Sequence, residues 1–327
     1  PSSPATTKKP PAEKSYHLIQ DIETFRTWVD QAKHHGVVAF DTETTSLDPL
    51  NAKLVGISLC FQNNDACYIP VGHIQETGGL FDAPTQNLKQ IPLQDALDIL
   101  RPLLADPGVL KIAQNAKYDM AVLRQYGCEV VGFDDTMVMS YVIDGALHGH
   151  GLDELSKLYF DHTNISFKDM IASIGKKDAT FDQVSLEKAV NYAAEDADMA
   201  CQLYQVLHQR LVNEKASRIY ETFDKPLIPI LLNMECAGIQ VDVEKMKELS
   251  RDLSIRLEEL NTQIQELSPR PFNVASPKQL SEILFQDMGL TVSGKRGKAG
   301  AFSTNVDVLE ALSLQGHTIA DKILAWR

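Results

Sequence analysis

The sequence predicts an α/β domain with a mixed sheet, followed by a mostly helical segment. Residues 37–40, 54–61 and 66–71 are apolar runs rich in β-branched and aromatic side chains, a composition typical of buried strands. Because short turns join these runs, we expect an antiparallel meander. Another strand-like run at 109–113 stands between helical patterns, which indicates an α/β domain. From about residue 214 the apolar spacing is almost entirely helical.

Length and composition suggest how the chain is divided. A chain of 327 residues exceeds the usual single domain of about 100–200 residues, so we expect two domains. The first residues are rich in Pro, Ser and Thr, as linkers are. We therefore predict a linker over residues 1–14, the α/β domain over 15–213 and the helical domain over 214–327. The chain begins at Pro1 and stops inside a helical pattern, so we expect a piece of a longer protein.

Composition also argues against several classes of protein. No apolar run approaches the length of about 20 residues that a membrane span needs. The five cysteines show no Cys-x-x-Cys spacing, which fits reduced thiols in a cytoplasmic protein and disfavours a zinc site or a disulfide framework. A net charge of −13 argues against a broad basic surface. It does not exclude nucleic acid, because bound metal ions can supply positive charge locally.

Turn signals and helical spacing place the remaining elements. Ser185 is the predicted N-cap of a long helix that runs to about Leu211. A basic, glycine-rich stretch at 293–300 predicts either a solvated loop or a contact with a DNA backbone. The other helices are expected at 96–104, 120–126, 136–143, 152–160, 226–236, 243–267, 277–288, 306–314 and from 318 onward.

An acidic pair, Asp41 and Glu43, follows the first apolar run. Residues two apart on a strand point to the same face, so both carboxylates would project together from the end of the strand. Neighbouring carboxylates repel, and burial raises the cost of ionising both; a hard cation between them relieves that cost. The pattern predicts either a metal site or an acidic strand-to-loop turn that Asp48-Pro49 closes.

Two more acids fit the first of these interpretations. Asp119 opens a helix directly after a strand, and Asp196 lies on the long helix, four residues after Tyr192, so that Tyr192 and Asp196 share one face. Alone, either acid is more commonly a surface or helix-start residue. Together with Asp41 and Glu43 they carry about the charge of two Mg²⁺ ions, which form a clamp for phosphoryl displacement when about 3.5–4 Å apart. We therefore predict a metal-dependent phosphodiesterase in which Tyr192 orients a water molecule.

Three short motifs carry a family resemblance. The segments 41–44 (Asp-Thr-Glu-Thr), 115–119 (Asn-Ala-Lys-Tyr-Asp) and 192–196 (Tyr-Ala-Ala-Glu-Asp) resemble the exonuclease motifs of the 3′–5′ proofreading domain in family A DNA polymerases of the bacterial DNA polymerase I type. The last has the Tyr-x-x-x-Asp form of the class with four acids and one tyrosine. Segments 223–231 and 238–242 resemble the opening of that family's polymerase domain, and 272–280 the start of its thumb. The resemblance covers the chain from Tyr16 onward.

The resemblance implies an RNase H-like (DnaQ-type) exonuclease fold followed by a truncated, all-α thumb. It implies that Asp41 bridges two Mg²⁺ or Mn²⁺ ions, that Glu43 and Asp196 complete the tighter site, and that Asp119 holds the second ion largely through water. Tyr192 and Glu43 would position the attacking hydroxide. Further residues are implied to contact the substrate strand: Leu47, Gln114, Asn115, Tyr118 and Phe167. For Leu47 and Phe167 the alternative is simple core packing.

The chain departs from the family pattern at Gly149, where the resemblance leads us to expect an arginine that contacts the strand. The polymerase motifs are also absent. We expect a monomeric, cytoplasmic and nucleoid-associated 3′–5′ exonuclease that serves DNA replication and repair. It would release deoxynucleoside monophosphates from single-stranded or frayed DNA ends, with no membrane partner. The alternatives are an exoribonuclease acting on RNA 3′ ends and a scaffold of the same fold that has lost catalysis.

Overall fold

The structure is a computed structural model that describes residues 14–74, 88–172, 174–175, 178–291 and 303–327. It divides into two compact units, with the first ending at Gly238 and the second beginning at Ile239. The linker expected before residue 14 and the basic loop expected at 293–300 lie outside the described residues.

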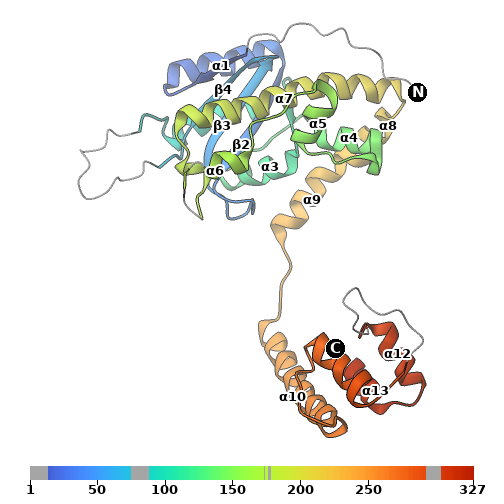
Figure 1. The fold of residues 1–327 in the computed structure, drawn as a ribbon. Helices are drawn as coiled ribbons and strands as arrows, with labels where there is room; N and C mark the ends of the chain where they lie inside the picture. The colour runs from blue at the N-terminus through green and yellow to red at the C-terminus, as the bar shows by residue number, and fades with distance from the viewer. Residues whose placement is uncertain (1–13, 75–87, 173, 176–177, 292–302) are drawn as a thin grey trace, which may run out of the picture. The chain divides into compact units, whose positions relative to one another are not determined.

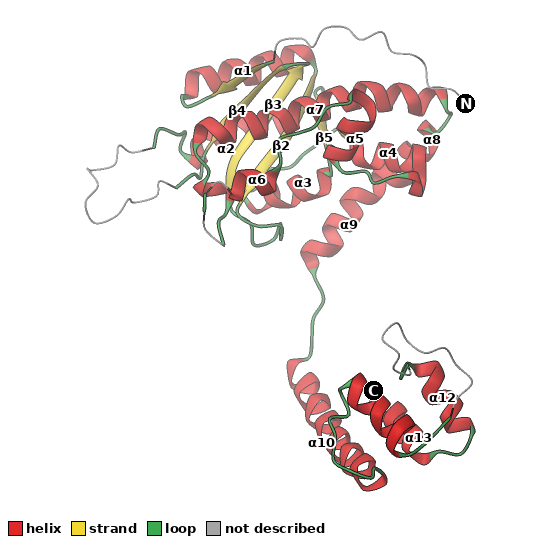
Figure 2. Ribbon diagram, viewed as in Figure 1, coloured by secondary structure: helices red, strands yellow, loops and turns green. Residues whose placement is uncertain are grey.

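The first unit is built on a six-stranded mixed sheet with the order β1-β4-β3-β2-β5-β6 (Figures 1 and 2). The strands β2, β3 and β4 pair antiparallel, which confirms the predicted meander, whereas β5 pairs parallel with both β2 and β6. β1 is parallel to β4. The strands are β1 Ser15–Leu18, β2 Val37–Thr44, β3 Leu54–Gln62, β4 Asp65–Pro70, β5 Leu110–Ala113 and β6 Phe133–Asp135.

Helices cover both faces of this sheet. Most of these helices lie where the sequence predicted them. The strand β6 was not predicted, because its three residues are too few to show a period. The α-helices of this unit are α1 Ile22–His35, α2 Leu93–Leu104, α3 Ala116–Gln125, α4 Thr136–Asp144, α5 Leu152–Phe160, α6 Phe167–Ala172, α7 Leu186–Asn213, α8 Ser217–Ile219 and α9 Lys225–Ala237. Short turns of other helix types occur at η1 Gly145–Leu147, η2 Phe181–Gln183 and η3 Tyr220–Asp224.

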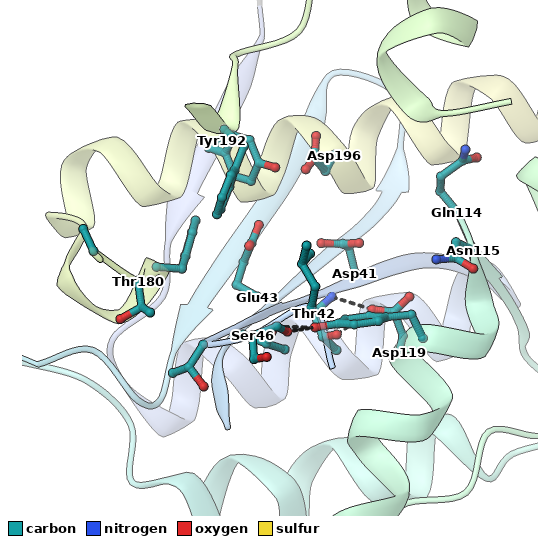
Figure 3. Close-up of a pocket in the computed structure, with 17 residues that line it drawn as sticks. Asp41, Thr42, Glu43, Ser46, Gln114, Asn115, Asp119, Thr180, Tyr192 and Asp196 are labelled. Carbon is teal, nitrogen blue, oxygen red and sulfur yellow. Dashed lines mark hydrogen bonds between the residues drawn. The ribbon is translucent and has the colours of Figure 1, made fainter. Parts of the chain in front are cut away.

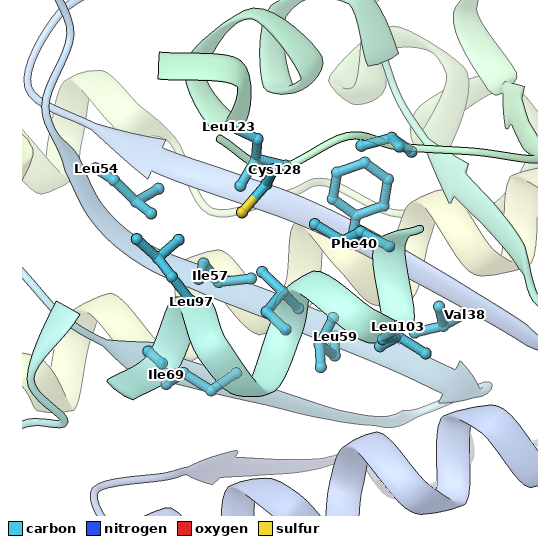
Figure 4. Close-up of a cluster of buried hydrophobic side chains, with 14 of the residues drawn as sticks. Val38, Phe40, Leu54, Ile57, Leu59, Ile69, Leu97, Leu103, Leu123 and Cys128 are labelled. Atoms are coloured by element: carbon cyan, nitrogen blue, oxygen red, sulfur yellow. The ribbon is translucent and has the colours of Figure 1, made fainter. Parts of the chain in front are cut away.

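One face of the sheet packs on α1, α2 and α3. Val38 and Phe40 of β2, with Ile57 and Leu59 of β3, are buried against apolar side chains of these helices, among them Leu97 of α2 (Figure 4). Along each strand these residues alternate with residues that point to the other face of the sheet, as in a strand that is buried on both sides. This cluster is the main core of the first unit.

The long helix α7 covers the opposite face (Figure 1). Its contact residues are small: Ala194, Ala197 and Ala200 pack against Ala39 of β2 and Cys60 of β3. Side chains of this size let the helix backbone approach the sheet closely, because no long side chain separates them. The close approach brings the middle of α7 within reach of side chains at the end of β2.

The first unit extends beyond the domain boundary that we placed at residue 214. Apolar residues of α9, Ile228 and Leu232, belong to the same core as α1–α3. The Tyr220 hydroxyl donates to Asp134 Oδ1 at 3.0 Å, and Lys225 Nζ lies 2.7 Å from the same atom. These contacts reach back to β6, the strand that the sequence analysis missed. Residues 214–238 therefore pack with the first unit.

The second unit is helical, as predicted. Its core joins Ile264 of α10 to apolar residues of the later helices, including Leu280, Leu309 and Ile323. Its elements are α10 Val243–Leu267, α11 Pro277–Ser281, η4 Glu282–Asp287, α12 Val306–Leu314 and α13 Thr318–Trp326. No helix among the described residues combines the length and apolar character that a membrane crossing would require.

The close packing of α7 on the sheet predicts the effect of one enlarged side chain. Ala197 is fully buried, so Ala197→Leu should lower the free energy of unfolding by about 1–3 kcal/mol through overpacking. Chemical denaturation measures this difference. Val212→Leu, at an exposed position of the same helix, is the control and should change stability by less than about 0.5 kcal/mol. Equal effects of the two substitutions would contradict the packing argument.

Candidate active site

β2 presents Asp41 and Glu43 on the face of the sheet that α7 covers. Val38 and Phe40 pack toward α1–α3, whereas Ala39 packs against α7. Since successive side chains of a strand alternate between faces, residues 39, 41 and 43 all point toward α7. Both acids lie within the strand, so they do not belong to the acidic turn that was the alternative interpretation. Sequence spacing alone thus accounts for this half of the site.

The carboxylate of Asp196 completes a cluster with this pair. Ligand oxygens of Asp41, Glu43 and Asp196 all lie within 4.8 Å of one another. Figure 3 shows Asp196 and Tyr192 projecting from α7 toward the two acids of β2, with Asp119 on the far side of Asp41. The end of a strand and a helix far later in the chain therefore contribute to one group of acids.

A cavity of about 640 Å³ opens over this cluster (Figure 3). Every catalytic, metal-binding and substrate-binding residue that the sequence analysis proposed lines it. The lining residues are Asp41, Thr42, Glu43, Thr44, Thr45, Ser46, Leu47, Gln114, Asn115, Tyr118, Asp119, Phe167, Ala179, Thr180, Phe181, Tyr192 and Asp196.

Burial and mutual repulsion make the acids of the cluster hard to ionise. Burial is the largest cause that raises the pKa of Asp41, and the charge of Asp196 adds to it. Burial also raises the pKa of Glu43, with further contributions from Asp41, Asp196 and Asp119. The pKa values of Asp119 and Asp196 are raised as well, again chiefly by burial. A positive charge close to these four acids would stabilise their ionised forms.

One oxygen of the cluster lacks any partner that could stabilise a negative charge. Glu43 Oε1 is buried and has no hydrogen-bond partner, although buried polar atoms are nearly always paired. Carboxylate oxygens are the ligands that Mg²⁺ and other hard cations prefer. The donor set of the cluster, all oxygen and all acidic, therefore fits a divalent cation.

Asp119 is held in place by Thr42, a residue that the sequence analysis did not single out. Asp119 Oδ1 accepts hydrogen bonds from the Thr42 backbone N–H at 3.0 Å and from Thr42 Oγ1 at 2.5 Å. These bonds partly offset the burial that raises its pKa. Thr42 lies between the two acids of β2, so one strand segment supplies two carboxylates and fixes a third.

The strand-to-helix turn before Asp119 is also fixed by a side chain far away in sequence. Asn115 has φ 63° and ψ 48°, a left-handed conformation that asparagine tolerates better than most residues. The backbone N–H groups of Asn115 and Ala116 donate to the Asp135 carboxylate, at 3.2 and 2.8 Å. Asp135 also caps α4. Its carboxylate thus satisfies the N-termini of two helices and orients the residues that line the cavity.

An aromatic wall bounds the cavity beside Asp196. The ring centroid of Phe167 lies 6.1 Å from that of Tyr192 and 6.5 Å from that of Phe181. Phe167 is 48% exposed and Leu47 is 93% exposed, which excludes the core packing that was the alternative for both residues. Phe181, by contrast, is buried and supports the wall from behind.

Several residues of the cavity carried no signal that sequence reasoning used. Thr180 and Phe181 belong to a short segment before α7, and no regular period marks it. The Ser46 carbonyl accepts a hydrogen bond from Tyr118 at 2.5 Å, a contact made through the backbone and so independent of residue type. Only the polar threonine between Asp41 and Glu43 could have been noticed, as a buried hydroxyl in an apolar strand.

The mixed sheet, the flanking helices and the acid-lined cavity define the class to which the first unit belongs, that of 3′–5′ exonuclease domains. A sequence profile described as 3′–5′ exonuclease matches residues 16–212, and one described as DNA polymerase family A matches residues 243–327.

The relatives identify the family more narrowly. The chain is 43% identical over 322 residues to DNA polymerase I of Rhizobium leguminosarum, covering 96% of this chain and 31% of that protein. It is 36% identical over 321 residues to DNA polymerase I of Pseudomonas aeruginosa, covering 97% and 34%. The chain therefore belongs to the bacterial DNA polymerase I family, and it spans about a third of the length of these relatives.

A solved structure agrees with the fold. The POL domain of Pol1 from M. smegmatis, determined in complex with DNA primer-template and dNTP, aligns with a TM-score of 0.72 at 20% sequence identity, over 95% of this chain and 47% of that one. The predicted RNase H-like exonuclease fold followed by a helical segment is confirmed.

The raised pKa values predict how stability depends on pH. An unfolded aspartate has a pKa of about 3.9, and that of Asp41 is higher in the folded protein. Its contribution to stability is therefore lost as the pH rises through the raised value. Without divalent cations, the Asp41→Asn protein should therefore be more stable than the wild type at about pH 8. Each kcal/mol of repulsion that the substitution removes should raise Tm by roughly 2–4 °C.

Thermal unfolding at several pH values measures this effect. The gain should vanish toward about pH 3, below the unfolded pKa of about 3.9, where the wild-type group is mostly neutral in both states. Saturating Mn²⁺ should reverse the order by stabilising the wild type. Asp30→Asn, on the exposed side of α1, is the control and should show neither trend. A variant less stable than the wild type at pH 8 without metal would contradict the repulsion argument.

Proposed function

We propose that this chain hydrolyses the 3′-terminal phosphodiester of single-stranded or frayed DNA, using two divalent cations, Mg²⁺ or Mn²⁺, and releasing deoxynucleoside monophosphates. The observation that carries the proposal is the convergence of Asp41, Glu43 and Asp196 within 4.8 Å. It joins an acid pair on the sheet to an acid on α7, in a domain of the 3′–5′ exonuclease family.

The proposed ligands of one cation are Asp41, Glu43 and Asp196. Asp41 and Asp119 are the proposed ligands of the second, with Asp119 acting largely through water. The unpartnered oxygen of Glu43 and the raised pKa values of all four acids support this assignment. When bound, the cations would supply charge stabilisation for the attacking and leaving oxygens of a phosphodiester.

The chain's own residues would orient the attacking water molecule. Burial raises the pKa of Tyr192, so its hydroxyl stays protonated and can donate a hydrogen bond. Glu43 can accept one from the same water. As the new P–O bond forms, the bond from phosphorus to the 3′ oxygen of the preceding nucleotide breaks. The products are a nucleoside 5′-monophosphate and a strand with a new 3′ hydroxyl.

Rigidly held side chains around the cavity are the proposed substrate contacts. Gln114 is fixed because its Nε2 donates to the His150 carbonyl at 2.7 Å. Tyr118 is fixed by its bond to Ser46, and Asn115 by the turn it occupies. Leu47 at the exposed rim would wedge against the terminal base. Phe167 would stack on a base, a contact that tolerates every sequence, as a proofreading nuclease requires.

Two other functions are outcomes of the same assays. An exoribonuclease would prefer RNA to DNA in side-by-side digestion of matched strands; the match of residues 243–327 to family A polymerases favours DNA. A scaffold without catalysis would bind no Mn²⁺ in titration calorimetry; the presence of all four acids in one cavity favours binding.

Removal of one acid tests the proposed chemistry. Asp41→Ala should lower the rate of mononucleotide release from single-stranded DNA with Mg²⁺ by at least several hundredfold, because the charge stabilisation that metal ions supply is worth several kcal/mol. Chromatography of the released monophosphates measures the rate. Asp30→Ala, on the exposed side of α1, should retain wild-type activity. Full activity in a correctly folded Asp41→Ala protein would reject the assignment.

The charge of the cavity predicts a weak dependence of binding on salt. Among the described residues that line it, none is a lysine or an arginine. At Gly149, where the resemblance leads us to expect an arginine, the backbone N–H donates to Glu154 Oε1 at 2.9 Å. A Cβ at this position would lie 2.1 Å from Glu154 Oε2, the flexible end of a side chain that can move aside.

Restoring the cation should therefore increase the salt dependence. In the background Glu154→Gln, which prevents the guanidinium from being neutralised, Gly149→Arg should steepen the slope of log K against log salt by about 0.7 if it gains one phosphate contact. Fluorescence anisotropy of a labelled single strand measures the slope. Gly149→Gln in the same background adds similar bulk without charge and should leave the slope unchanged. Identical slopes for Arg and Gln would show that no phosphate passes this position.

A further inference from the structure

Glu195 precedes Asp196 on α7, yet its carboxylate contacts a different part of the protein. Successive helical residues point about 100° apart, and Glu195 reaches the segment between α5 and α6 instead of the cavity. The residue Glu195 is only 4% exposed. A buried carboxylate is costly unless it is paired and hydrogen-bonded, so its partners show what it holds.

Three donors meet on this carboxylate, one from Lys14 and two from the segment between α5 and α6. Lys14 Nζ lies 2.7 Å and His162 Nε2 2.8 Å from Oε1, and the backbone N–H of Ile165 donates to Oε2 at 2.7 Å. Both oxygens of Glu195 therefore have partners, and the carboxylate is an anchor for this segment. In the cavity, by contrast, Glu43 Oε1 has no hydrogen-bond partner.

The anchored segment leads directly into the aromatic wall. Ile165 lies two residues before Phe167, the first residue of α6. The neighbouring bonds of this segment are local: His162 N–H donates to Ser156, and Met170 N–H to Ser166. The bond from Ile165 to Glu195 ties the segment to α7, the helix that also carries Tyr192 and Asp196.

We infer that Glu195 is a positioning residue for substrate binding: through Ile165 it fixes the Phe167 ring at the wall of the cavity where a base stacks. This inference rests on the proposed nuclease function. One helix then sets both the acid cluster and the base-stacking ring, so that their separation is constant. Lys14 Nζ and His162 Nε2 are the other two partners of this anchor.

Glu195→Gln tests the inference because it keeps the size of the side chain and removes its charge. A glutamine amide has one acceptor oxygen, so it cannot serve all three donors. KM for single-stranded DNA should rise roughly fivefold to tenfold, part of the stacking contribution of about 1–3 kcal/mol per base, while kcat stays within about twofold of the wild type. Glu23→Gln, on the exposed face of α1, is the matched control and should change neither constant.

A double-mutant cycle identifies the residue through which Glu195 acts. Phe167→Ala should raise KM by itself, and adding Glu195→Gln should raise it little further, since the ring to be positioned is gone. Independent, multiplicative effects would overturn the inference. So would a fall in kcat at constant KM, which would mean that Glu195 acts on the acid cluster.

Hydrogen exchange separates this inference from the proposed function. In the full chain, the Ile165 amide should exchange faster in Glu195→Gln than in the wild type, whether or not the protein digests DNA. Unchanged exchange at Ile165 would overturn the anchor, whereas a wild type without nuclease activity would refute the proposed function alone. If Glu195→Gln does not fold, His162→Ala loosens the same segment, and an unchanged KM in that variant would overturn the inference.

Discussion

The repulsion among four crowded carboxylates, of which Glu43 and Asp119 are buried and Asp41 and Asp196 are half-buried, is the constraint on which the site depends. Burial is the largest cause that raises the pKa of each of these acids, and the negative charges of neighbouring acids add to it. A fold that nevertheless brings them together must obtain its stability elsewhere. The cores on the two faces of the sheet supply it through apolar burial, which explains why the acids sit at the end of a strand whose preceding residues are entirely apolar.

The second requirement is close approach of α7 to the sheet. Alanines on the helix face alanine and cysteine on the strands, so the backbone of α7 comes near enough for a short aspartate to reach the β2 acids. The same helix carries acids in two electrostatic states. Asp196 lacks a cationic partner among the described residues and has a raised pKa, whereas Glu195 is paired with Lys14 and His162 and has a lowered one. Of two adjacent positions on one helix, one therefore belongs to the acid cluster and the other anchors the segment before Phe167.

Much of the fold followed from the sequence because its signals are local. The meander of β2–β4 and the helices α5, α10 and α12 lie where apolar periodicity predicted them. The strand β6 did not, since three residues cannot display a period. The association of α8 and α9 with the first unit also escaped prediction, because it depends on Tyr220 and Lys225 meeting Asp134, a contact about 90 residues distant in sequence that no local pattern records.

The sequence by itself determined that Asp41 and Glu43 lie on the same face of β2, because residues two apart on a strand point to the same side. It also determined, through motifs, the family to which the chain belongs. Only the tertiary structure decided that Asp196 lies within 4.8 Å of that pair, that Thr42 holds Asp119, and that Phe167 and Leu47 are exposed at the cavity. The physical reason is that these relations arise from packing between elements, and packing depends on side-chain size and on partners far apart in the chain.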